Sequence, residues 1–136
     1  PLKDDQLMAI LPPTHPLVEA DRFPVERLRQ EPFIEFLPGQ ETDNSRMLQQ
    51  LQIRPKVRFA TSDSRAAIAM VRAGLGITLL NDILTADLAD GVAVLPLDPP
   101  QSVHLGIALP EEEHVSPAAK RFITYALDRL PELDVL

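Results

Sequence analysis

Several polar side chains of this sequence occupy loops that leave predicted strands and enter predicted helices, where α/β proteins bind small molecules. Most of these side chains carry hydroxyl groups. A helix that begins beside them adds free backbone N–H groups and a partial positive charge, so the combination favours an organic anion. The predicted binding residues are Gly39, Thr42, Ser45, Thr61, Ser62 and Asn81.

The same residue types also cap helix N-termini, so the sequence leaves a second interpretation open. The side chains of Thr42, Asp43, Ser62 and Asp63 can each accept a hydrogen bond from the first turn of a helix. In that case they stabilise helices and bind no ligand.

The sequence predicts no catalytic residue. It lacks the G-x-S-x-G turn that carries a hydrolase nucleophile. His15, His104 and His114 lie too far apart for the short ligand spacing of a metal-binding helix or finger, so no metal site is predicted. His15 and His114 are expected in exposed loops, and His104 at an outward-facing strand position. Gly74-Leu75-Gly76 follows a helix and precedes a strand, which is the reverse of a dinucleotide-binding loop, so no cofactor is predicted either.

A helix-to-strand unit at Ser64–Leu80 organises the predicted fold. Residues 64–73 are good helix formers with one apolar stripe. Gly74 is the residue type that closes a helix at positive φ, and Gly76 permits a tight reversal before the apolar run Ile77–Leu80. A helix between strands is the crossover that parallel pairing requires, so the predicted class is α/β, with a Rossmann-like parallel or mixed sheet flanked by helices.

Two further runs predict strands parallel to Ile77–Leu80. Phe33–Leu37 is rich in aromatic and β-branched residues. Lys56–Ala60 alternates Val57 and Phe59 with charged residues, which is typical of a half-buried edge strand. If the three strands run parallel, right-handed crossovers place their C-terminal ends at one edge of the sheet. The loops after them then line a single crevice.

The remaining pattern predicts strands at 6–12, 92–97 and 103–109 and short helical turns at 23–28 and 81–88. A helix is predicted to start at Asp43 or Asn44 and to end before Pro55. A C-terminal helix is predicted to begin at Pro117 after the cap residue Ser116. The expected buried stripe of that helix is Phe122, Ile123, Ala126, Leu127 and Leu130.

Composition restricts the possible function classes. The 136 residues suit one domain or one lobe of a larger protein. A net charge of -7 and the absence of a basic cluster disfavour direct binding to nucleic acid by this segment. The sequence contains no Cys, which excludes disulfides and thiolate metal sites. It shows neither a long apolar run nor a signal segment, so a cytoplasmic location is expected.

Three motifs, in this order, resemble the effector-binding domain of LysR-type transcriptional regulators: Thr14–Leu17, Val71–Leu80 and Ser116–Ile123. Their order and separation follow that family along nearly the whole chain. Members of the family have two lobes of the type II periplasmic-binding-protein fold, joined by two crossing strands. The family commonly has Pro at the position of Asn81. Its winged helix-turn-helix and the opening half of lobe one have no counterpart in this sequence.

The resemblance implies a division of the chain into three parts. Residues 1–31 correspond to the first crossing strand and a linker into lobe two, residues 32–97 to lobe two, and residues 98–136 to the return strand and a helix toward lobe one. It also implies a function, which is to sense a small metabolite between the lobes and to control transcription through lobe closure and oligomer geometry.

The resemblance further implies partners. The protein is expected to form a homodimer or homotetramer and to contact DNA only through an N-terminal domain absent from this chain. The predicted oligomer contacts are Leu48, Gln49, Gln52 and Arg58. A solute-binding protein lobe for transport has the same fold and is the main alternative. An enzyme on this fold is disfavoured, because no nucleophile, base or metal set converges on the crevice.

Overall fold

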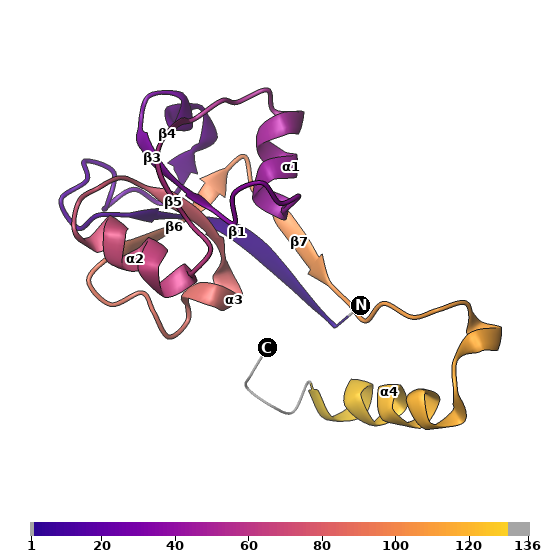
Figure 1. Ribbon diagram of the computed structural model, residues 1–136. Coiled ribbons are helices and arrows are strands. Elements are labelled where there is room, and N and C mark those ends of the chain that lie inside the picture. The colour runs from indigo at the N-terminus through magenta and orange to yellow at the C-terminus, as the bar shows by residue number, and fades with distance from the viewer. Residues whose placement is uncertain (1, 131–136) are drawn as a thin grey trace. The chain divides into compact units, whose positions relative to one another are not determined.

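The computed structural model describes residues 2–130 of the chain (Figure 1). The backbone divides into two compact units. The main unit is Gln6–Val103, and the described residues of Pro1–Asp5 and His104–Leu136 form the terminal unit. The chain passes between the units twice, at residues 5–6 and 103–104. Within residues 2–130, no helix combines the length and the apolar character needed to cross a membrane.

The elements follow the predicted order closely, with strands and helices alternating through the main unit. They are β1 (Lys3–Leu11), β2 (Phe23–Pro24), the 3-10 helix Val25–Arg29, β3 (Pro32–Phe36), α1 (Asp43–Gln50), β4 (Lys56–Thr61), α2 (Ser64–Arg72), β5 (Thr78–Asn81), α3 (Asp82–Thr85), β6 (Ala93–Asp98) and β7 (Ser102–Leu105), followed by the 3-10 helix Glu112–His114 and α4 (Pro117–Arg129).

Within residues 2–130, a five-stranded sheet (β2, β6, β1, β5 and β7) and a two-stranded sheet (β3 and β4) are joined at one parallel bridge into a mixed arrangement. β3 and β4 pair in parallel from Pro32↔Lys56 to Phe36↔Thr61. A parallel bridge joins Phe33 to Ile77 at the start of β5, where the Ile34 N–H donates to the Ile77 carbonyl at 2.8 Å. β3 therefore lies between β4 and β5. The other strands follow in the order β5-β1-β6-β2, with β1 antiparallel to both of its neighbours β5 and β6 and with β7 also paired to β1.

Two apolar layers cover the faces of the sheet, and β1 contributes to both. Leu7, Ala9 and Leu11 pack into one cluster with Met47 of α1, whereas Met8 and Ile10 pack into the other with the apolar face of α2. This alternation follows from the period of two along a strand. α1 and α2 accordingly lie on opposite faces of the sheet (Figure 1). The predicted sheet flanked by helices is confirmed.

β4 is the edge strand that the sequence predicts, but the predicted half-burial is wrong. Val57 is 47% exposed and Phe59 is 43% exposed. Phe33 pairs with Val57 and Ile34 with Phe59, so Arg58 is an extra residue in β4. An inserted residue of this kind moves the following side chains to the other face. Val57 therefore shares a face with Phe33, whereas Phe59 lies on the opposite face. The two apolar side chains cannot pack together, and both remain exposed.

The ends of α1 and α2 have the same geometry but different residues. After α2, Gly74 has a φ of 81°, its N–H donates to the Val71 carbonyl, and the Leu75 N–H donates to Met70. This is the six-to-one and five-to-two bonding of a Schellman motif, as Gly74 predicts. After α1, Gln52 takes the equivalent position with a φ of 54°. A left-handed conformation is strained for a residue with a Cβ atom.

We expect Gln52→Gly to raise the free energy of unfolding by about 0.5–1 kcal/mol, because glycine removes the strain at positive φ but loses more chain entropy on folding. Urea denaturation of the two chains measures the difference. Gln49→Gly is the matched control inside α1 and should lower the free energy of unfolding by about 1 kcal/mol. A Gln52→Gly chain less stable than its parent would contradict the left-handed assignment.

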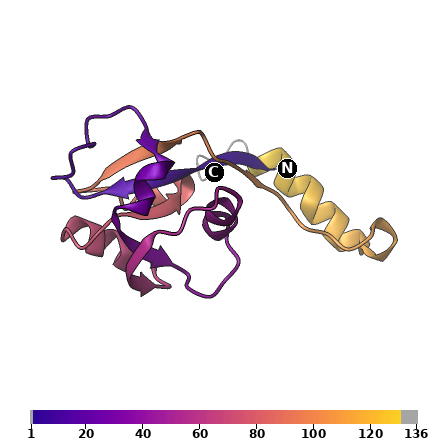
Figure 2. The same cartoon turned by 90° about the horizontal axis from the view of Figure 1, so that it is seen from above.

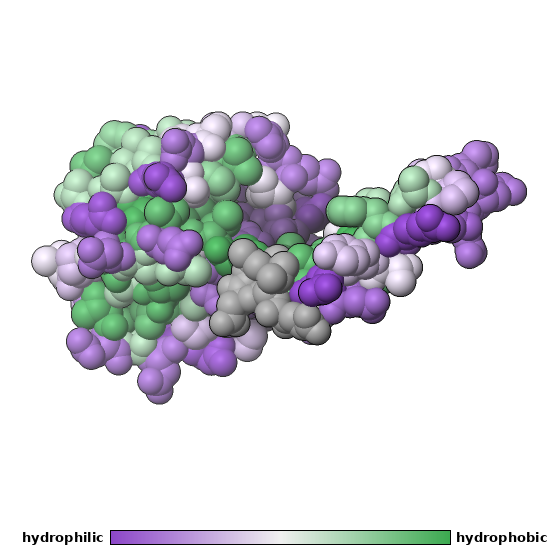
Figure 3. All heavy atoms as spheres, turned by 90° about the horizontal axis from the view of Figure 1, so that it is seen from below, coloured by the Kyte–Doolittle hydropathy of each residue, from purple (hydrophilic) through white to green (hydrophobic). Residues whose placement is uncertain are grey.

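The terminal unit contains the predicted C-terminal helix, and Ser116 caps it by accepting a hydrogen bond from the Ala119 N–H at 3.2 Å. The predicted burial is wrong, because Phe122 is 69% exposed and Leu127 is 45% exposed. Among residues 104–130 no apolar surface encloses this stripe. The strand predicted over 103–109 also ends early, at Leu105, and the chain then runs to the 3-10 helix without regular structure (Figure 2). Apolar residues reach the surface of both units (Figure 3).

Candidate functional site

The parallel strands bring the predicted binding loops to one edge of the main unit. Phe36 and Thr61 are register partners at the ends of β3 and β4, and the Leu37 N–H donates to the Thr61 carbonyl at 2.9 Å. The Asn44 side-chain amide donates to the Leu79 carbonyl at 2.8 Å, which ties the start of α1 to β5. The C-terminal ends of the three strands and the N-termini of the helices after them therefore share this edge.

Two of the predicted binding hydroxyls already have partners at the start of α1. Thr42 Oγ1 accepts from the Ser45 N–H at 3.1 Å, and the Thr42 N–H donates to Ser45 Oγ at 2.8 Å. The Ser45 hydroxyl donates to the Thr42 carbonyl at 3.0 Å. This reciprocal arrangement is a capping box. Both hydroxyls consequently stabilise α1 in this structure, as the capping interpretation predicts for Thr42.

The other predicted residues have different surroundings. Asp63 caps α2, accepting from the Arg65 and Ala66 N–H groups at 2.8 and 3.1 Å. Thr61 Oγ1 accepts from the Asp63 N–H at 3.2 Å, whereas Ser62 is exposed and is not the cap of α2. Asn81 stands at the N-cap position of α3 without a side-chain capping bond.

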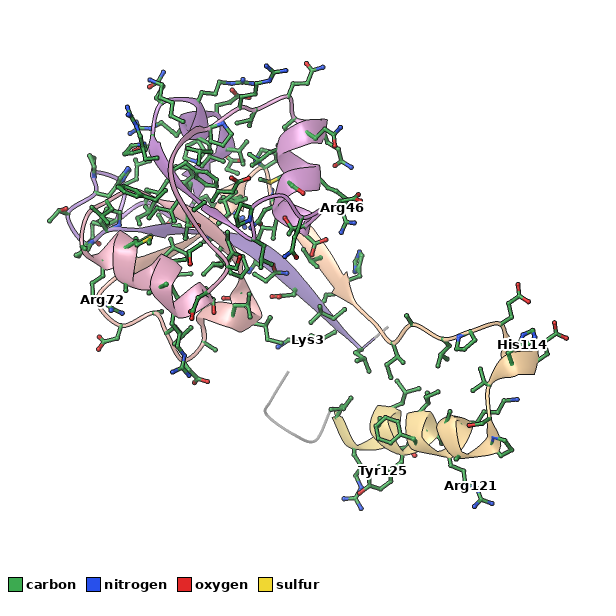
Figure 4. The ribbon with its side chains drawn as sticks, viewed as in Figure 1. Lys3, Arg46, Arg72, His114, Arg121 and Tyr125 are labelled. Carbon is green, nitrogen blue, oxygen red and sulfur yellow. The ribbon has the colours of Figure 1, made fainter. Side chains whose placement is uncertain are left out.

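The charged side chains at the start of α1 pair with one another. Arg46 bonds Asp43 at 2.6 Å and lies 3.8 Å from Glu41. The hydrogen bond and the charge of Asp43 raise the pKa of the Arg46 guanidinium, which stays protonated at every ordinary pH. Arg46 extends from α1 (Figure 4) and lines a small hollow with Leu7 of β1 and Val103 of β7. Asp43 is therefore an ion-pair partner in the first turn, and Thr42 is the cap.

A hollow of about 380 Å³ lies between α1 and the strands β3 and β4. We call it the α1 groove. Thr42 and Ser45 line it together with Leu48 and Gln49, which the sequence assigned to an oligomer contact. Gly39, Thr61, Ser62 and Asn81 do not line it. The lining residues are Phe33, Glu35, Phe36, Leu37, Gln40, Thr42, Asn44, Ser45, Leu48, Gln49, Ile53, Arg54, Pro55 and Val57.

Two polar residues with structural importance were missed. Asn44 is 9% exposed, and its Oδ1 is buried without a hydrogen-bond partner among the described residues. His15, predicted to be exposed, is also 9% exposed. The Leu17 N–H donates to His15 Nδ1 at 3.1 Å, so Nε2 carries the proton and donates to Glu31 Oε1 at 2.8 Å. The sequence around His15 does not predict this bond, because Glu31 lies sixteen positions further along the chain.

The terminal unit holds a group of possible metal ligands. One ligand atom from each of Glu111, Glu113 and His114 lies within 4.8 Å of the others, and all three residues are exposed. Exposed carboxylates and a histidine without buried supporting groups make a weak cation site. His104, also in this unit, is exposed as predicted, and its Nδ1 lies 2.7 Å from Asp4 Oδ1.

Comparison with known proteins identifies the family. Residues 1–131 match the LysR substrate binding domain. The HTH-type transcriptional regulator YvbU of Bacillus subtilis is 29% identical over 127 residues, which are 92% of this chain and 44% of YvbU. The chain therefore spans less than half the length of this relative.

Solved structures show the same fold. HinK, a LysR family transcriptional regulator from Pseudomonas aeruginosa, superposes with a TM-score of 0.77 at 24% identity, over 98% of this chain and 48% of HinK. The effector-binding domain of QuiR in complex with shikimate gives 0.73 at 21% identity, over 97% of this chain and 64% of that one. The predicted type II periplasmic-binding-protein-like architecture is confirmed.

The match covers nearly the whole chain and comes from a family of regulator domains that are not enzymes, as the sequence predicts. The motifs at Thr14–Leu17, Val71–Leu80 and Ser116–Ile123 all fall inside the matched range. This chain belongs to the LysR substrate-binding domain family.

Proposed function

We propose that this chain is one part of the effector-sensing region of a LysR-type transcriptional regulator. In this proposal residues 32–97 form lobe two, residues 1–31 lead into it, and residues 98–136 return toward lobe one. A small anionic metabolite binds between the lobes, and the resulting closure changes the oligomer and its DNA-binding heads. The DNA-binding domain and the rest of lobe one belong to a longer, cytoplasmic protein.

The observation that carries the proposal is the common edge formed by the ends of β3, β4 and β5. In open α/β sheets, ligands bind outside the carboxyl ends of the strands. Here the N-termini of α1 and α2 stand at that edge. QuiR, which has the same fold, binds shikimate, a carboxylate. The proposed effector contacts are Gly39, Thr42, Ser45, Thr61, Ser62 and Asn81.

We expect Thr42→Asp in the full-length regulator to weaken binding of an anionic effector at least about tenfold, because a carboxylate at the α1 N-terminus repels it. Asp caps helices at least as well as Thr, so the melting temperature should change little. Calorimetric titration with shikimate, or with whichever small hydroxycarboxylate raises the melting temperature of the regulator, measures the affinity.

Ser116→Asp is the matched control for this variant. It also replaces a hydroxyl cap by a carboxylate cap, but at α4 and outside the proposed contacts. Its effector affinity should equal that of the parent. Unchanged affinity in Thr42→Asp, or an equal loss in both variants, would remove the α1 N-terminus from the effector site.

The assembly proposal concerns α1 and the edge strand β4 of the main unit. We propose that Leu48, Gln49, Gln52 and Arg58 contact a second subunit in a homodimer or homotetramer. Supporting this, Arg58 is the exposed extra residue of edge strand β4, and β4 leaves Val57 and Phe59 uncovered. Exposed apolar residues on an edge strand favour an interaction partner.

We expect Arg58→Glu to weaken self-association of the full-length regulator about tenfold, because reversing a charge within an interface replaces attraction by repulsion. Light scattering after size-exclusion chromatography, over a series of protein concentrations, measures the change. Arg65→Glu reverses an exposed charge on α2 and should leave the mass unchanged. Identical mass profiles for both variants would exclude β4 from the interface.

A solute-binding protein lobe for transport remains the second candidate, since it has the same two-lobe fold. The residues upstream of Pro1 distinguish the two. A regulator has a winged helix-turn-helix there, whereas a transport protein has a secretion signal.

A further inference from the structure

We propose that the α1 groove is a second ligand site, which adjoins the proposed effector contacts at Thr42 and Ser45, and that it binds a primary ammonium ion on a short apolar stem. The proposal concerns residues of the main unit alone. It also differs from the effector proposal in the sign of the ligand's charge.

The size and the apolar walls of the groove suit a small molecule. Its volume of about 380 Å³ lies in the range of ligand pockets, about 300–1,000 Å³. Phe33 and Ile53 are buried in its wall, while Val57 remains 47% exposed. Covering such carbon surface by an alkyl stem is favourable. Leu48 of α1 continues this apolar wall.

The polar groups of the groove determine the sign of the ligand. Glu35 is half-buried in the lining, and among residues 2–130 no hydrogen bond or ion pair reaches its carboxylate. Asn44 also lines the groove, and its Oδ1 is buried without a partner in the same range. The bond from Asn44 Nδ2 to the Leu79 carbonyl fixes which end of the amide is unpaired. Both unpaired groups are hydrogen-bond acceptors, but Asn44 Oδ1 is enclosed, so Glu35 is the acceptor of the two that a ligand in the groove can reach.

An ammonium ion supplies what the Glu35 carboxylate lacks. It carries three N–H donors and a positive charge, so it can both bond and neutralise a carboxylate. A half-buried carboxylate without a counter-ion is costly, and burial beside apolar walls strengthens its attraction for a cation. A carboxylate ligand would instead be repelled by the charge of Glu35.

The protein's own cations do not fill this role. Arg46 is paired with Asp43, and both line a different, smaller hollow with Gln50. Arg54 is the cation in the lining, but it is exposed and forms no ion pair with the described residues. The α1 groove thus contains a half-buried carboxylate, Glu35, that no cation of the described residues pairs with.

The backbone at the groove supports a role beyond folding. Leu37 has a φ of 55°, a conformation that costs a residue with a Cβ about 1–2 kcal/mol. Glycine would avoid this strain, and the next residues, Pro38 and Gly39, already form a turn. The leucine side chain nevertheless lines the groove. Strained residues of this kind are concentrated at ligand sites.

A titration followed by ¹⁵N NMR tests the proposal on this chain, with n-butylammonium chloride as the probe and n-butanol and sodium butyrate as matched compounds. We expect saturable shifts at the amides of Glu35, Leu37 and Val57, with a dissociation constant for the amine on the order of millimolar. Butanol should bind at least about fivefold more weakly, and butyrate should cause no saturable shift.

Three variants separate charge from shape. Glu35→Gln should weaken amine binding about tenfold, and Arg54→Gln should strengthen it about twofold, because each alters the charge facing the ammonium ion. Glu41→Gln is the control, since Glu41 is 77% exposed and lies outside the lining. Equal binding of butyrate and the amine, unchanged affinity in Glu35→Gln, or no saturable shift with any compound would overturn the proposal.

Discussion

Replacing Gly76 by Ala should lower the free energy of unfolding by about 3 kcal/mol or more, since strain and overpacking act at one position. An added Cβ would lie 2.6 Å from the Pro32 carbonyl oxygen and 3.1 Å from its carbon. Both are backbone atoms of β3, so they cannot rotate away as a side chain can. The φ of 158° adds further strain.

Gly76 directly precedes Ile77, the residue that hydrogen-bonds to β3 at the start of β5. The neighbouring Ile77 N–H donates to the same Pro32 carbonyl at 2.9 Å, and Ile77 also receives the bond from Ile34. A Cβ at Gly76 would push these strands apart at the bridge that holds the crevice edges together. Chemical denaturation of this chain measures the loss of stability, and the effect should extend to effector binding in the full-length protein.

Gly74→Ala is the matched control two residues earlier. Its φ of 81° is also strained for alanine, but no atom lies within 4 Å of the added Cβ. Loss of the favoured helix-terminating glycine should therefore cost about 1 kcal/mol. If both variants lost the same stability, the close contact with Pro32 would not exist in solution.

The second large effect concerns α4 and depends on the length of the protein. Phe122→Ala should cost the full-length regulator about 3–5 kcal/mol, the usual loss for a buried phenylalanine. In this chain alone the same change should cost less than about 0.5 kcal/mol, because Phe122 is 69% exposed. The difference follows from the proposal that the rest of lobe one packs on α4.

Denaturation of the parent and variant in both lengths gives the comparison. Arg121→Ala removes a polar side chain of the same helix (Figure 4) and should have little effect in either length. An equally small effect of Phe122→Ala in the full-length protein would show that its lobe one does not cover this stripe.

Local sequence signals predicted the parallel strands well. Phe33–Leu37 and Ile77–Leu80 are apolar runs of strand length, and the helix between 64 and 73 ends at a glycine that adopts the predicted positive φ. Each of these features is determined by residues close together in the chain, so the sequence alone is enough to predict it. The order of the strands could not be predicted from the sequence, because β1 comes first in the chain but lies between β5 and β6 in the sheet.

Burial was harder to predict where it depends on distant residues. The bulge at Arg58 moves Phe59 to the other face, and no local pattern announces an extra residue in a strand. The apolar stripe of α4 has the correct spacing for burial but lacks its cover among the described residues. His15 shows the reverse error, because its partner Glu31 stands just before β3.

The sequence predicted that the loops after β3, β4 and β5 share one edge, but it did not predict what their side chains contact. Hydroxyls were chosen because they precede helices, yet this position makes Thr42 and Ser45 a capping box. Asn44, between them and hydrogen-bonded to β5, gave no sequence signal, because an amide in a first helical turn is usually exposed. The α1 groove also depends on which face of β3 carries Glu35, and only the fold determines that.

The proposed function requires the strand ends at this edge to hold an effector between two lobes. Backbone NMR of the complete effector-binding domain, titrated with the hydroxycarboxylate that stabilises it, tests this arrangement. We expect saturable shifts at Thr42, Ser62 and Asn81 with the same dissociation constant. Shifts confined to other parts of the domain, with these three amides unmoved, would contradict it.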